Sequence, residues 1–70
     1  MHYDIDISWD SSAGVWCAVC DEIPIALENA SFDKLISRVK VATPEILSLN
    51  GKNTKNVNLY FKTYHMEKIA

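Results

Sequence analysis

The sequence predicts an α+β domain in which a three-stranded antiparallel meander is followed by one helix packed on the sheet and by a fourth strand beside the first. Three observations predict this fold. Apolar residues alternate with polar ones near both ends of the chain, an Ile-Pro corner interrupts the second quarter, and a capped amphipathic helix follows that corner. The 70 residues form a single domain spanning 1–70. A chain of this size buries only ~60% of its unfolded surface.

The first three predicted strands occupy the N-terminal part of the chain. Residues Tyr3–Trp9 alternate apolar and polar side chains, which indicates a half-buried strand. The turn formers that follow lead into Val15–Asp21, whose two faces are both apolar, so we expect a central strand. Pro24 cannot donate a ladder hydrogen bond, and the chain therefore bends there before a short edge strand at Ile25–Glu28.

The predicted helix begins at Ser31, whose hydroxyl can cap the first amide groups, and apolar residues then recur every three or four positions up to Asn50. Pro44 lies inside this pattern. It either kinks one helix, or occupies the first turn of a second helix capped by Thr43. The apolar phase continues through Pro44 without a slip, which favours one kinked helix. Asn50 and Gly51 are expected to end it.

The last predicted strand is Asn56–Tyr64, with Val57, Leu59 and Phe61 facing the core. The crossover rule for such connections places the helix across one face of the sheet and this strand beside the first. The tail His65–Ala70 is assigned no role.

Charge and hydropathy exclude several classes of function. The net charge is −2, and residues 1–33 contain no Lys or Arg, which disfavours direct nucleic-acid binding and suits a basic protein partner. The N-terminus has no basic segment followed by an apolar one, as a signal peptide would. No run approaches the ~20 apolar residues of a membrane helix. We therefore expect a soluble, cytoplasmic chain that does not contact a membrane.

The Cys17-x-x-Cys20 spacing invites a redox or zinc-binding interpretation. In a strand, however, residues three apart point to opposite faces and lie ~10 Å from each other. We expect two reduced thiols with packing roles. His2 and His65 have no motif partners and are expected to be solvated or partly packed, so no metal or other cofactor is predicted.

Three carboxylates of the first strand region, Asp4, Asp6 and Asp10, admit three interpretations. The three interpretations are a metal-binding set, a solvated strand face, and an acidic patch that faces a partner protein. Two-metal chemistry requires carboxylates that converge from different elements, which favours the solvated face. Trp9 and Trp16 either stack on a ligand or, as we favour, make core or dimer contacts.

The stretch from Val15 to Leu49 resembles the HicB-like antitoxin superfamily. The resemblance rests on four segments in order, Val15–Val19, Asp21–Pro24, Ala30–Leu35 and Pro44–Asn50, and the last is similar to a branch of short stand-alone prokaryotic domains of unknown function. It implies a β-β-β-α-β fold with partial ribonuclease-H-like topology. It also implies dimers, and an antitoxin that caps a small basic toxin, itself an mRNA-cleaving ribonuclease.

The hypothesis from sequence is therefore a non-enzymatic, homodimeric, antitoxin-like module that binds a small basic protein. The expected partner-binding residues are Asp4, Asp6, Asp21, Glu22 and Trp16. The alternative is an orphan homodimeric domain that binds a metabolite or another protein. A metal-dependent nuclease is a distant third.

Overall fold

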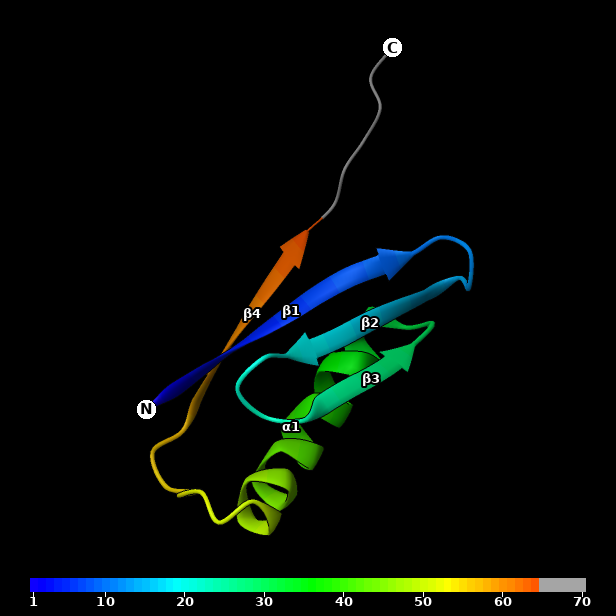
Figure 1. The fold of residues 1–70 in the computed structure, drawn as a ribbon. Helices are drawn as coiled ribbons and strands as arrows, with labels where there is room; N and C mark the ends of the chain where they lie inside the picture. Colours follow the sequence, from blue (N-terminus) through cyan, green and yellow to red (C-terminus); the bar gives the residue numbers. More distant parts are fainter. Residues whose placement is uncertain (65–70) are drawn as a thin grey trace.

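Four strands and one helix follow one another in the order β-β-β-α-β (Figure 1). The structure is a computed structural model that describes residues 1–64. The elements are β1 (His2–Asp10), β2 (Val15–Cys20), β3 (Ile25–Asn29), α1 (Phe32–Leu49) and β4 (Asn58–Tyr64). This order and the α+β class confirm the fold predicted from sequence. The expected tail His65–Ala70 lies outside the described residues.

The strands form one mixed sheet in the order β3-β2-β1-β4. The meander is antiparallel, with Ile7 opposite Ala18 and Ala18 opposite Leu27. Strand β4 runs parallel to β1, with Ile5 beside Phe61. The chain therefore crosses from one edge of the sheet to the other through α1, and the last strand lies beside the first as predicted (Figure 1).

Strands β1 and β3 extend one residue beyond the predicted bounds, at both ends of β1 and at the end of β3, whereas β2 and β4 are shorter than predicted. Strand β4 begins at Asn58 rather than Asn56, because Asn56 has a positive φ of 55° that breaks the extended backbone. Strand β2 ends at Cys20, and Asp21 belongs to the turn that follows. Inside that turn Ile23 is buried, and its carbonyl accepts the N–H of Ile25 at 2.8 Å. The corner around Pro24 therefore contributes to the core as well as reversing the chain.

Helix α1 is continuous through Pro44, which confirms the one-helix alternative. The Ser31 hydroxyl caps its start by accepting the N–H of Lys34 at 3.3 Å. Gly51, with a φ of 67°, closes its end: the N–H groups of Gly51 and Lys52 donate to the carbonyls two and three residues before the C-cap Asn50. Pro44 is tolerated because it removes only one backbone donor within a helix whose adjoining turns pack on the sheet.

The core lies between α1 and one face of the sheet. The fully or nearly fully buried apolar residues are Tyr3, Ile5, Ile7, Ala18, Ile23, Ile25, Leu35, Val39 and Leu47. Helix α1 approaches β3 and β2 most closely, so the β4 side of the same face is less well covered. Leu59 and Phe61 of β4 face the core as predicted but remain half-buried. The opposite face, called here the open face, carries no covering element among residues 1–64 (Figure 1).

Candidate functional site

The open face brings together carboxylates at one end of the sheet. Asp4 and Asp6 project from β1 onto this face, because the buried residues Tyr3, Ile5 and Ile7 alternate with them. Asp21 and Glu22 lie exposed in the turn after β2. That turn is at the end of the sheet where β1 begins, since β1 and β2 are antiparallel with Asp6 opposite Val19. The fold thus gathers four of the predicted residues into one acidic end.

Lys62 partly neutralises this acidic end. Its Nζ lies 3.3 Å from Asp4 Oδ2, and the two side chains are 51% and 39% exposed. An ion pair exposed to this degree contributes ~0–1 kcal/mol at most, because water and salt screen it. Asp6 lies beside Lys62 in the register, so Asp4 and Asp6 share one neighbouring cation. Net negative charge therefore remains at the acidic end.

An apolar strip runs next to these carboxylates on the open face. Val19, 44% exposed, is opposite Asp6 on one side and opposite Ala26 of β3 on the other. One step along β2, Cys17 is paired with Glu28. The open face therefore combines exposed aliphatic side chains with a border of carboxylates.

Trp16 is not part of this surface. It projects from β2 toward α1, with its ring 5.2 Å from that of Trp9 and 5.1 Å from that of Phe32. It therefore lies on the opposite face and at the other end of the sheet from the turn that carries Asp21. The structure therefore does not bring Trp16 together with the acids, and the interpretation of both tryptophans as packing residues agrees with this geometry. Alternation within β2 had already placed Trp16 on the face of Ala18.

The three aspartates of β1 do not converge. Asp10 is at the far end of the strand, where its Oδ1 accepts the N–H groups of Ser12 and Ala13 at 3.0 and 3.2 Å. Its carboxylate therefore stabilises the hairpin turn. Within residues 1–64 no group of three or more His, Cys, Asp or Glu side chains is arranged to hold a metal ion. This geometry favours the interpretation of Asp4 and Asp6 as a solvated or partner-facing strand surface.

The remaining candidates from sequence are dispersed. Cys17 faces the open side and Cys20 faces α1, as expected for residues three apart in a strand, and both are free thiols. The ring of His2 packs edge-on against Tyr60, with centroids 4.9 Å apart. His65 lies outside the described residues. Among residues 1–64, no helix combines the length and the apolar character needed to cross a bilayer.

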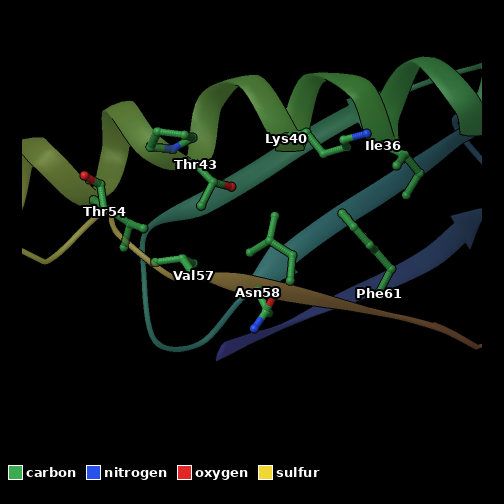
Figure 2. Close-up of a pocket in the computed structure, with 10 residues that line it drawn as sticks. Ile36, Lys40, Thr43, Thr54, Val57, Asn58 and Phe61 are labelled. Atoms are coloured by element: carbon green, nitrogen blue, oxygen red, sulfur yellow. The ribbon is translucent and has the colours of Figure 1, made fainter. Parts of the chain in front are cut away.

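A groove that the sequence analysis did not identify lies between α1 and β4 (Figure 2). This α1–β4 groove has a volume of about 510 Å³. Its apolar lining comes from two parts of the chain, Ile36, Pro44 and Leu47 on the helix and Val57, Leu59 and Phe61 on or next to β4. Thr43 points into the groove, and its hydroxyl donates to the Val39 carbonyl at 2.6 Å. Lys40 is the charged residue of the lining.

Within residues 1–64, the fold and these surfaces define a small α+β domain with one helix on a mixed sheet, an open face and a groove beside the helix. Residues 2–69 match a family described as a domain of unknown function, DUF1902, and the chain belongs to that family. The chain is also similar to a solved structure, the crystal structure of the hypothetical protein TTHA1013 from the extremely thermophilic bacterium Thermus thermophilus. The two are 30% identical, with a TM-score of 0.85 over 99% of this chain and 100% of that one. No curated protein matches the chain.

Proposed function

We propose that this chain is a non-enzymatic, antitoxin-like interaction module that acts in the cytoplasm as a homodimer and binds a small basic protein through its open face. The observation that carries the proposal is the acidic end, where Asp4, Asp6, Asp21 and Glu22 meet beside the exposed strip around Val19. The carboxylates attract a basic partner over distance, and the apolar strip supplies the contact that excludes water.

The HicB-like relationship is part of this proposal, and it rests on the sequence segments named above. On that basis the module covers the active surface of a toxin rather than reacting with it. Binding of this kind needs complementary shape and charge, and the carboxylates of the acidic end support the charge part of the proposal. The charge contribution acts mainly on the association rate and weakens as salt rises.

Co-purification with the product of the neighbouring gene tests the proposal. We expect a complex whose association rate falls at least about tenfold when Asp4, Asp6 and Asp21 become Asn and Glu22 becomes Gln. The control changes Asp33→Asn and Glu45→Gln on α1, which neutralises two carboxylates away from the open face, and it is compared with Asp4→Asn and Asp6→Asn together. Repeated recovery of this chain without the product of the neighbouring gene would refute the proposal. Equal losses of association rate in the open-face variant and the control would refute it too.

The α1–β4 groove favours one second candidate, a homodimeric domain that binds a small molecule. Its volume of about 510 Å³ and its lining of mixed apolar and polar side chains resemble ordinary ligand pockets. A metabolite in the groove raises the melting temperature of the wild-type chain but not that of Ile36→Trp, which fills the space. A metabolite mixture that shifts both proteins equally, or neither, counts against this candidate.

A further inference from the structure

The two edges of the sheet are protected to different degrees. Strand β3 is short, follows Pro24 and lies against α1. Strand β4, Asn58–Tyr64, contains no Pro and is rich in aromatic residues. Helix α1 lies closer to β3 and β2 than to β4. Folded proteins normally block such an edge with Pro, a bulge, charge or a covering element, since it otherwise pairs with another chain. Lys62, the charged residue of β4, is already engaged with Asp4.

The hydrogen-bonding groups of β4 are arranged for a further strand. The N–H of Asn58 donates to the Met1 carbonyl at 3.1 Å, so the even-numbered residues of β4 direct their backbone groups toward β1. By alternation, Leu59, Phe61 and Thr63 direct their N–H and C=O groups away from β1, toward the outer edge of the sheet. The same three residues carry their side chains on the face of α1.

We propose that β4 pairs antiparallel with β4 of a second copy of this chain, about a two-fold axis at Phe61. This register places Phe61 opposite the second copy's Phe61, and Leu59 opposite the second copy's Thr63. Each of these facing pairs has outward-directed backbone groups on both strands, so each exchanges two hydrogen bonds and the ladder holds about six. Shifting the axis to Tyr60 or Lys62 shortens the ladder. The register centred on Phe61 therefore gives the largest number of outward backbone N–H and C=O groups a hydrogen-bond partner.

The side chains are compatible with this pairing. On the open face, Lys62 lies opposite the second copy's Tyr60, which is 54% exposed in the single chain. A cation is placed beside an aromatic ring and no two like charges face each other directly. On the other face, the half-buried Phe61 residues meet between the two helices. The two α1–β4 grooves then join across the axis, which covers the part of the core that α1 leaves partly exposed.

A second copy is the occupant that these observations favour, because one segment supplies both halves of the contact. An isologous interface requires a surface that complements itself. The seven residues of β4 meet this requirement about Phe61 without any other element. The inference rests on the dimeric part of the proposed function and is independent of the basic partner, which contacts the open face.

Two proline variants test the pairing. Thr63→Pro removes an outward N–H, so we expect it to keep the folded spectrum by circular dichroism but to sediment as a single chain. The wild type is expected to sediment at about twice its 7.9 kDa mass. Lys62→Pro is the control, since its N–H points toward β1 and its loss should weaken the fold itself.

A disulfide test decides the register even if Thr63→Pro does not fold. In a background with Cys17→Ser and Cys20→Ala, Phe61→Cys should cross-link to itself, because paired Cα atoms lie ~5.5 Å apart. Leu59→Cys, on the same strand and face, should not, because its counterpart lies ~13 Å away along the strand. A dimer in which Phe61→Cys stays reduced overturns the β4 pairing alone. A wild type that remains a single chain at about 1 mM overturns the pairing and the dimeric state together.

Discussion

Truncation of Leu35 to Ala should remove most of the stability of this domain. Leu35 is wholly buried on the face of α1 that packs against the sheet. The change removes an isopropyl group, worth about 2.4 kcal/mol at about 0.8 kcal/mol per carbon. The cavity left behind adds to this loss, since helix and sheet relax only partly, and the total is about 2.5–5 kcal/mol. A chain of this size has about 3–5 kcal/mol in all.

Urea unfolding followed by circular dichroism measures this loss. Leu35→Ala should be largely unfolded in the absence of urea, or should unfold at a far lower concentration than the wild type. Val41→Ala is the matched control, since Val41 is on the same helix but 77% exposed, and its stability should stay within about 0.5 kcal/mol of wild type. Both proteins are compared at one chain concentration, because a dimer is more stable when concentrated. Equal midpoints for the two variants would refute the packing of α1 described above.

Three further changes test local features of the fold by the same unfolding assay. Ser31→Ala removes the cap of α1 and should cost about 1 kcal/mol, whereas Ser31→Thr, which keeps the hydroxyl, should cost less. Gly51→Ala places a side chain at a φ of 67° and should cost about 1–2 kcal/mol, although open space surrounds the new Cβ; a neutral result would contradict the left-handed helix end. Asp4→Asn breaks the ion pair with Lys62 and should lower the free energy of unfolding by less than about 1 kcal/mol, because both side chains are partly exposed. This limit should hold at low salt as well, and a larger loss would contradict the solvent-screened pair.

The acidic end could be predicted in part from the sequence. Alternation in β1 put Asp4 and Asp6 on one face, and the corner before Pro24 put Asp21 and Glu22 in a turn. Their proximity follows from antiparallel pairing of β1 with β2, which a hairpin between neighbouring strands makes almost automatic. The position of Trp16 on the opposite face from these acids could not be predicted, because both faces of β2 are apolar and hydropathy alone does not tell which of them α1 covers.

The α1–β4 groove could not be predicted from the sequence in the same way. Ile36 and Phe61 are far apart in the chain, and only the crossover brings them to one surface. The groove exists because α1 lies closer to β3 and β2 than to β4. That offset depends on how the helix packs over a twisted sheet, and no local pattern encodes it.

The sequence by itself determined the five elements, their faces, the cap at Ser31 and the position of the last strand beside the first, because these depend on local periodicity, backbone chemistry and the handedness of crossovers. The tertiary structure alone decided which of the two apolar faces of β2 the helix covers, how far the helix lies from β4, and which residues meet across the groove. These properties depend on contacts between residues distant in the chain, where the packing of whole elements outweighs the preference of any single segment.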